Sequence, residues 1–320
     1  MNMDMKTAKP VYSNKTLGKR IWQYRWIYLL LLPGIVQVAI FAYGPMYGIQ
    51  LAFRNHNFFD GIWGSPFVGL EHFRRMFSDP MFFRALRNTL TLAFMNLIVG
   101  FPVPIILAIL INEIRNRKFS RTLQTIFTFP NFLSWIIISG IVFQLFGSAG
   151  VINTTVQTFF PNWGNSVLRS GHQFRWMLVF SQIWQSAGWT SIMYLAAITG
   201  IDPGLYESAT IDGAGRFQRI WYITWPGMRF MALMMLILAA GGLLSGNFDQ
   251  IFQLHNANVL PQAEILSIYN FRLFRGLMPN YGYITALGLF TGIINGLLLL
   301  TANRISAKIR GESVFAANKG

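Results

Sequence analysis

The stretch that determines the fold is residues 207–226, which read ESATIDGAGRFQRIWYITWP. It is a short polar segment between long apolar runs. Asp202 and Pro203 come shortly before it. Asp is favoured as the N-cap of a helix and Pro as its first residue, so these residues predict a short helix over about 203–211.

The rest of this stretch predicts a turn and a second helix. Asp212 and Gly213 are a turn signal. A second short helix is expected over about 215–222, and Pro226 then begins an apolar helix. The prediction is a helix-turn-helix that lies on a membrane surface with its charged side facing water.

Composition predicts an integral membrane protein. Hydrophobic residues make up 53% of the chain and charged residues 12%, which is too apolar for a soluble domain. Several apolar stretches reach the roughly 20 residues that cross a hydrocarbon core of about 30 Å. The fold class is therefore an all-α, multi-pass membrane protein. The chain has no Cys, which excludes disulfides and thiolate metal sites.

We predict six transmembrane helices. Their ranges are about 26–53, 85–111, 122–146, 174–200, 227–246 and 283–303. Pro102 and Pro104 are expected to kink the second span, since each removes a backbone donor and clashes with the preceding turn. Pro130 lies inside the third. The first span follows a basic segment, as in a signal peptide, but it is too long and lacks a clear cleavage site.

The distribution of basic residues predicts the orientation. Of the 26 Lys and Arg residues, 17 fall on the side of both termini and of the 207–226 segment, and 9 fall on the opposite side. The side with more Lys and Arg is cytoplasmic. We therefore place both termini and this segment in the cytoplasm. A cytoplasmic side rich in Lys and Arg also explains the net charge of +15, so the charge does not indicate nucleic-acid binding.

The residues quoted first also carry a resemblance to a known family. Their spacing resembles the cytoplasmic loop of permease subunits in binding-protein-dependent ABC importers: Glu-Ala-Ala, three residues, Gly, a spacer, Ile, one residue, Leu-Pro. Five positions match: Glu207, Ala209, Gly213, Ile223 and Pro226. Ser208 replaces the middle Ala and Trp225 the Leu, and both changes are mild because Ser is small and Trp is apolar.

The resemblance covers about residues 85–304. Within the family, the aromatic-rich chain and the lead-in Ile201-Asp202-Pro203 look most like oligosaccharide and polysaccharide uptake permeases. The chain is accordingly divided into 1–84 (basic tail, first span and outer loop), 85–304 (an ABC-transporter type 1 transmembrane domain) and 305–320 (a cytoplasmic tail).

The resemblance implies several partners in a bacterial inner membrane. They are a second homologous permease, two ATPase subunits that hold ATP and Mg, an extracytoplasmic solute-binding protein and a saccharide substrate, besides membrane lipid. The cytoplasmic loop would dock on an ATPase through Glu207, Ser208, Ala209, Asp212, Gly213, Ala214 and Arg216. Glu207 near a helix N-terminus also has a purely structural explanation, worth about 0.3–1 kcal/mol. For Arg216 and Arg219, contact with the partner and contact with lipid headgroups are both open.

The search for a catalytic site finds none. Gly18-Lys19 lacks the upstream Gly and the following Ser or Thr of a phosphate-binding loop, so any ATP chemistry belongs to a partner. The four His residues are scattered without metal-ligand spacing. An intramembrane serine protease built on Ser245 and His255 would lack a nucleophile motif. We expect a non-catalytic subunit with no cofactor or metal of its own.

Polar and aromatic residues in the spans are candidates for a substrate path, because polar groups inside a membrane are costly and often functional. The candidates are Asn96, Trp135, Gln144, Gln182, Trp184, Gln185, Tyr194, Asn247 and Gln250. Interface anchoring and helix packing are the competing explanations. The outer segments hold nine Arg and no Lys. Arg suits bidentate carboxylate recognition, so an acidic saccharide and an acidic binding protein explain the pattern equally well.

The alternative function is a secondary transporter driven by an ion gradient. Such a carrier is expected to bury acidic groups within its spans, whereas the eleven Asp and Glu residues here fall in loops, span ends and tails. A membrane scaffold without transport activity is a third class, and only the 207–226 motif argues against it.

Overall fold

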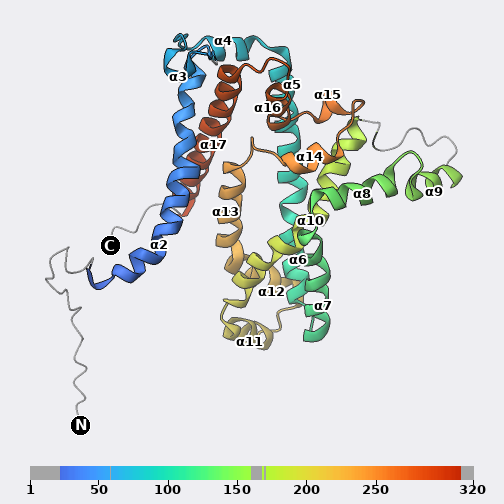
Figure 1. The fold of residues 1–320 in the computed structure, drawn as a ribbon. Helices are drawn as coiled ribbons and strands as arrows, with labels where there is room; N and C mark the ends of the chain where they lie inside the picture. Colours follow the sequence, from blue (N-terminus) through green and yellow to red (C-terminus); the bar gives the residue numbers. More distant parts are fainter. Residues whose placement is uncertain (1–21, 58, 160–167, 169–170, 311–320) are drawn as a thin grey trace. The chain divides into compact units, whose positions relative to one another are not determined.

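The computed structural model describes residues 22–57, 59–159, 168 and 171–310 (Figure 1). The described residues form helices, turns and loops and contain no β-strand. Two isolated β-bridges join Arg54 to Phe67 and Asn57 to Gly61. The chain divides into two units, residues 1–50 and 51–320. Most of the predicted basic tail before the first span, and residues 311–320, lie outside the described residues.

The first unit contains one long helical path. It consists of α2 (Arg25–Val38), the π-helix η1 (Ala39–Tyr43) and the start of the 3-10 helix η2 (Gly44–Phe53). By length and composition, Arg25–Phe53 is a candidate membrane span. This agrees with the span predicted over 26–53.

The second unit contains four more candidate spans. They are Pro80–Asn112, Trp135–Phe159, Arg216–Gly241 and Tyr281–Lys308. The helix α10 (Gly171–Thr199) is 29 residues long and corresponds to the fourth predicted span. It is not among the candidate spans, because these were chosen for apolar composition as well as length. Five candidate spans are therefore found in the described residues, and the sixth crossing stays a prediction.

The second predicted span begins earlier than expected and is irregular. It consists of α5 (Pro80–Met95), the π-helix η3 (Asn96–Gly100) and α6 (Pro102–Asn112). The π-helix ends just before Pro102, where the Phe101 amide donates to the Asn96 carbonyl at 2.9 Å. The expected disturbance thus lies in the turn before the two prolines.

The third predicted span, 122–146, is not continuous. The helix α7 (Arg117–Thr128) ends in the 3-10 turn η4 (Phe129–Phe132), which contains Pro130. A new helix, α8 (Trp135–Phe146), begins after Ser134, whose side chain accepts a hydrogen bond from the Ile137 amide at 3.5 Å. The prediction of one transmembrane helix over 122–146 is wrong because Pro130 ends one helix and Ser134 caps the next. The candidate span in this region is Trp135–Phe159.

Three segments between the predicted spans also contain helices. The segment between the first and second predicted spans forms α3 (Gly61–Gly64) and α4 (Glu71–Ser78), and α9 (Val151–Phe159) follows α8. The predicted loop over 247–282 folds into α14 (Phe248–Leu254), α15 (Leu260–Ala263) and α16 (Leu266–Phe274). The last helix, α17 (Tyr281–Arg310), extends beyond the predicted 283–303.

The core of the second unit is arranged around α10. This helix packs against α6, α7, η4, α13 (Trp225–Gly241) and α15. Gly188 permits the close approach of α7, since a Cβ atom there would lie 2.0 Å from the Phe127 carbonyl oxygen. Figure 1 shows α11 (Pro203–Ile211) at one end of this unit and α4, α15 and α16 at the other.

Three buried apolar clusters hold these helices together. One joins α8, α10, α14 and the α15–α16 region and includes Leu178 and Ile265. A second joins α4, α5, α16 and α17 and includes Phe82 and Tyr269. A third, at the α11 end, joins α6, α10 and α13 and includes Tyr194. The region between the first and third clusters is where a cavity forms.

Asp79 links the second cluster to the start of α5. Its carboxylate accepts hydrogen bonds from the Met81 amide at 2.8 Å, from the Tyr283 hydroxyl at 3.0 Å and from the Tyr269 hydroxyl. Burial alone would raise the pKa of Asp79, but the hydrogen bonds from Tyr269, Met81 and Tyr283 outweigh it and lower the pKa. The ionised form is therefore favoured by folding.

We predict that Asp79→Asn lowers the free energy of unfolding by about 1–3 kcal/mol at pH 7, because the amide retains the helix cap but loses acceptors for the tyrosine hydroxyls. Since the folded-state pKa is depressed, this contribution is present above the unfolded value of about 3.9 and is lost as pH falls through the folded value. Thermal unfolding in detergent between pH 7 and pH 3 measures it. Asp249→Asn, at an exposed position of α14, is the control and should leave the free energy of unfolding nearly unchanged. Equal losses of stability in the two variants would contradict a specific role for the Asp79 carboxylate.

Candidate functional site

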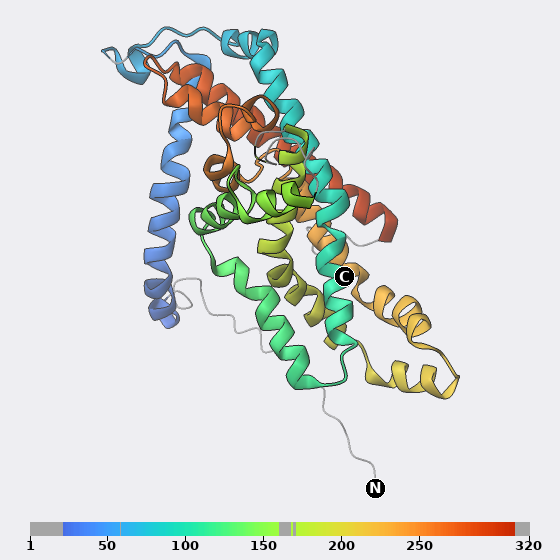
Figure 2. The ribbon, with the colours of Figure 1, turned by 90° about the vertical axis from the view of Figure 1, so that its right-hand side faces the viewer.

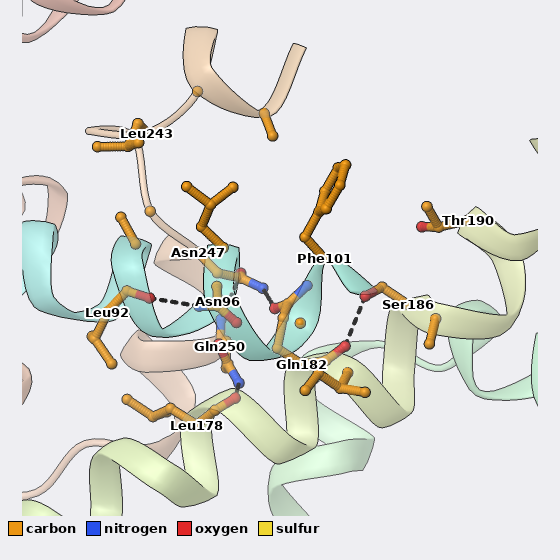
Figure 3. Close-up of a pocket in the computed structure, with 18 of the residues that line it drawn as sticks. Leu92, Asn96, Phe101, Leu178, Gln182, Ser186, Thr190, Leu243, Asn247 and Gln250 are labelled. Carbon is orange, nitrogen blue, oxygen red and sulfur yellow. Dashed lines mark hydrogen bonds between the residues drawn. The ribbon is translucent and has the colours of Figure 1, made fainter. Parts of the chain in front are cut away.

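A cavity of about 510 Å³ lies between α5–η3–α6, α10, the end of α13 and α14 (Figure 3). Its walls combine apolar side chains such as Leu92, Leu178 and Ile265 with amides and hydroxyls. The residues that line it include no Asp, Glu, Lys or Arg. A neutral cavity with several hydrogen-bonding groups suits a polyhydroxylated molecule better than an ion.

Five of the nine predicted path residues line this cavity. They are Asn96, Gln182, Tyr194, Asn247 and Gln250. The other four do not line it: Trp135 packs against the first apolar cluster, Gln144 is exposed on α8, Trp184 is 49% exposed on α10, and Gln185 is partly exposed on the same helix. The structure thus brings together residues from three separate segments, which spacing along the chain alone did not indicate.

Amide side chains form a network between α10 and α14 on one wall of the cavity. The Asn247 side-chain amide donates to Oε1 of Gln182 (Figure 3). Nε2 of Gln250 donates to the Leu178 carbonyl at 2.7 Å and to Oγ of Ser181 at 2.9 Å. Asn247 also caps α14, since its Oδ1 accepts from the Gln250 amide at 3.2 Å. This network fixes α14 against α10.

Several polar lining residues were missed from the sequence. Ser186 and Thr190 lie on the same face of α10 as Gln182 and Tyr194. The four residues recur at intervals of four positions, which is the spacing that aligns side chains along one helix face. That periodicity, applied from Gln182 onward, could have found them.

The predicted helix-turn-helix over 203–222 is present in part. The first helix, α11, has the predicted bounds, and the Asp202 side chain accepts from the Gly204 amide at 2.9 Å. Gly213 has a φ of 77°, in the left-handed region that favours Gly. The Ala214 amide then donates back to the Ala209 carbonyl at 2.8 Å, which closes the turn after the helix.

The second predicted helix, 215–222, does not end where expected. The one-turn helix α12 (Arg216–Arg219) continues through the π-helix η5 (Ile220–Thr224) into α13. Pro226 does not interrupt it. The turn before Pro226 is the π-helix η5, and a local π-helical adjustment lets a membrane helix accommodate a proline. Residues 216–241 therefore form one helical path.

Figure 2 shows the backbone of this hairpin, the yellow segment at the lower right. Side-chain contacts join its two arms. The Tyr206 hydroxyl lies 3.0 Å from Oγ1 of buried Thr224, and Arg219 donates to Oγ1 of Thr210 at 3.0 Å. Nε of Arg216 lies 3.0 Å from Oε2 of Glu113, the C-cap residue of α6. For Arg216 and Arg219 the sequence left open contact with a partner and contact with lipid headgroups. Neither explanation included these contacts within the chain.

The remaining predicted docking residues present an open surface. Glu207 is exposed, and no hydrogen bond or ion pair from its side chain is found among the described residues. Ser208 donates to the Gly204 carbonyl at 2.8 Å. Ile211 and Phe217 are 87% and 85% exposed beside them, so this end of the second unit combines an unpaired carboxylate with apolar side chains.

Comparisons with known proteins identify a family. Residues 77–311 match the family described as "Binding-protein-dependent transport system inner membrane component". The chain is 39% identical over 302 residues to the polygalacturonan/rhamnogalacturonan transport system permease protein YteP of Bacillus subtilis (strain 168), covering 94% of each chain. It is 39% identical over 293 residues to protein LplB of the same organism, covering 91% of each.

Two solved structures of ABC transporters also resemble this chain. The chain is similar to one from a bacterial ABC transporter involved in the import of the acidic polysaccharide alginate, with 36% identity and a TM-score of 0.84, covering 92% of this chain and 100% of that chain. A bacterial alginate ABC transporter in complex with an alginate pentasaccharide-bound periplasmic protein gives the same identity and TM-score and covers 94% of this chain and 100% of that chain.

The amide network yields a stability prediction. Gln250→Leu would leave the Leu178 carbonyl and the Ser181 hydroxyl without the buried donor they share, and we expect the free energy of unfolding to fall by about 1–3 kcal/mol. Thermal unfolding in detergent measures the loss. Gln185→Leu makes the same chemical change outside the cavity lining and is the control. A loss as large in the control would contradict a specific role for the network.

Proposed function

The chain belongs to the binding-protein-dependent transport system inner membrane component family, and on this premise we propose how it works and what it carries. It is a multi-pass inner membrane permease of an ATP-driven importer. Its substrate, in our proposal, is an acidic oligosaccharide or polysaccharide fragment that contains uronate residues. The relatives named for polygalacturonan/rhamnogalacturonan and for alginate carry this proposal.

The cavity supports a saccharide substrate. Side-chain amides and hydroxyls such as Asn96, Gln182 and Thr190 can donate to and accept from sugar hydroxyls. Apolar lining residues, Phe101 among them, offer surface for the apolar faces of sugar rings. The absence of acidic groups from the lining argues against a carrier driven by an ion gradient.

We propose six spans, with α10 as the fourth and both termini in the cytoplasm. The 29 residues of α10 are long enough to cross a core of about 30 Å. This topology puts the α11–α12 hairpin in the cytoplasm and the α14–α16 region outside. The excess of basic residues on the side of the termini supports this orientation.

The partners in this proposal are a second homologous permease, two ATPase subunits and an extracytoplasmic solute-binding protein. ATP and Mg would be held by the ATPase subunits, and this chain would bind no cofactor. The relative solved with a saccharide-bound periplasmic protein supports the last partner. The cavity described here would be one half of a path completed by the second permease.

The hairpin is the proposed coupling element, with Glu207, Ser208, Ala209, Asp212, Gly213 and Ala214 on the ATPase-facing side. Arg216 would act within the chain through Glu113. ATP closes the ATPase pair, the hairpin moves with it, and the spans change from inward-open to outward-open. Hydrolysis reverses the change and releases the saccharide inward. Such a cycle requires the hairpin to favour different span arrangements in the two nucleotide states.

We predict that Glu207→Lys abolishes association with the ATPase, because the substitution reverses the exposed charge next to Ile211 and Phe217. The measurement is purification of the tagged chain from native membranes in mild detergent, with mass spectrometry of the proteins that accompany it. Glu71→Lys reverses an exposed glutamate on α4, at the other end of the second unit, and should retain the ATPase. ATPase retained in both variants would refute the coupling role.

The substrate class is tested by transport. In vesicles that contain the complete transporter and its binding protein, we expect uptake of a galacturonate trimer to exceed uptake of the same trimer after reduction of its carboxyl groups. The physical reason is the loss of the carboxylates that arginine side chains can bind. Preference for the reduced, neutral trimer would overturn the acidic substrate and leave the importer function standing.

A further inference from the structure

A buried carboxylate organises the outer end of the second unit. Glu264 is 0% exposed and lies between α15 and α16. Its Oε2 is 2.9 Å from NH2 of Arg84 on α5, and its Oε1 is 2.7 Å from Nε of Arg272 on α16. Each carboxylate oxygen thus has a guanidinium partner from a different helix.

A third arginine joins this cluster through Asn88. NH2 of Arg175 on α10 donates to Oδ1 of Asn88 at 2.8 Å, and its Nε donates to the Gln262 carbonyl at 3.0 Å. The Asn88 amide in turn donates to the carbonyls of Pro261 and Glu264 at 3.0 and 3.1 Å. We refer to Arg84, Arg175 and Arg272 together with Glu264 as the arginine cluster.

The arginine cluster carries more positive charge than its own carboxylate neutralises. Two guanidinium groups pair with one carboxylate, and the third, that of Arg175, is held by Asn88 beside it. Nε of Arg84 is a buried donor that finds no acceptor among the described residues. The Arg84 and Arg272 side chains are nevertheless 38% and 47% exposed, so an anion from solvent can reach them.

The cluster adjoins the outer end of the cavity. Thr89 and Ile265, which line the cavity, directly follow Asn88 and Glu264 in the chain. The Leu266 amide donates to Oγ1 of Thr89 at 2.9 Å, which holds the two segments together at this boundary. The charge therefore lies just outside a cavity whose lining carries none.

We propose that the arginine cluster is a binding site for the carboxylate groups of the saccharide at the outer entrance to the cavity. This inference rests on the proposed uronate substrate. Arg binds carboxylates bidentately, and a uronate oligomer presents one carboxylate on each sugar. Because the cavity lining has amides and hydroxyls only, selection for charge takes place at the cluster, before the sugar enters the cavity.

An acidic surface of the binding protein is the competing ligand. The position of the cluster favours the substrate. Glu264 and Asn88 are buried at the cavity boundary, and the guanidiniums they hold are half-buried around them.

The test uses the complete transporter with its binding protein in vesicles, and the galacturonate trimer and its carboxyl-reduced form as probes. Arg272→Gln should lower uptake of the acidic trimer by roughly tenfold or more, the size expected for loss of a charge-assisted hydrogen bond. Uptake of the reduced trimer should stay within about twofold on the same argument. Arg272→Lys retains charge without the planar fork and should give an intermediate loss.

Removal of Arg272 also takes one partner from buried Glu264, so a second variant separates folding from binding. Glu264→Gln/Arg272→Gln replaces the ion pair with two neutral amides and should show the same selective loss. Arg275→Gln makes the same change at an exposed arginine outside the cluster, at the end of α16, and should retain uptake of both trimers.

Equal losses of both trimers in these variants would overturn the proposal in favour of a packing role. Losses restored for both trimers by excess binding protein would overturn it in favour of protein docking. A wild-type transporter that rejects the acidic trimer would overturn the substrate class itself, and this result is visible before any variant is compared.

Discussion

Broken helices inside a membrane protein must find new partners for the backbone groups that each break frees. In the second unit, side chains of neighbouring helices supply them. The Leu244 amide, just after α13, donates to Oδ1 of Asn295 on α17 at 3.0 Å. The Leu266 amide, at the start of α16, donates to Thr89 on α5. These contacts fix where the chain turns back, so that α14 and Ile265 become walls of the cavity.

The same arrangement separates neutral from charged polar groups. The cavity lining has amides and hydroxyls, whereas Glu264 with its arginines lies at one end of the second unit and the Glu113–Arg216 pair lies toward the other. A charge placed in the middle of the bundle would need a partner there to offset its desolvation. A path for a bulky saccharide is better served by neutral groups that can exchange hydrogen bonds as the sugar moves.

The continuous helix over 216–241 bears on how motion would reach the cavity. The sequence predicted a second short helix that ends at about residue 222, before Pro226 begins the next. Instead, α12, η5 and α13 form one path, and the hairpin is tied to it through Tyr206 and Thr224. Displacement of the hairpin therefore moves α13 directly, and α13 ends beside Leu243 and Asn247 in the cavity wall.

The sequence by itself determined the membrane class, the first span, the bounds of α11 with its Asp202 cap, and the family motif at 207–226, because hydropathy, capping and turn signals act over a few neighbouring residues. Five residues of the cavity lining were also within reach, since polar side chains in apolar helices stand out. The break at 129–134 has local signals in Pro130 and Ser134. Only the tertiary structure decided how the helices within 247–282 pack against the rest of the unit and that Arg216 pairs with Glu113. It alone joined Arg84 and Arg272 to Glu264 and placed Arg175 beside them through Asn88. Each of these depends on partners far away in the chain, so no local pattern of residues specifies them.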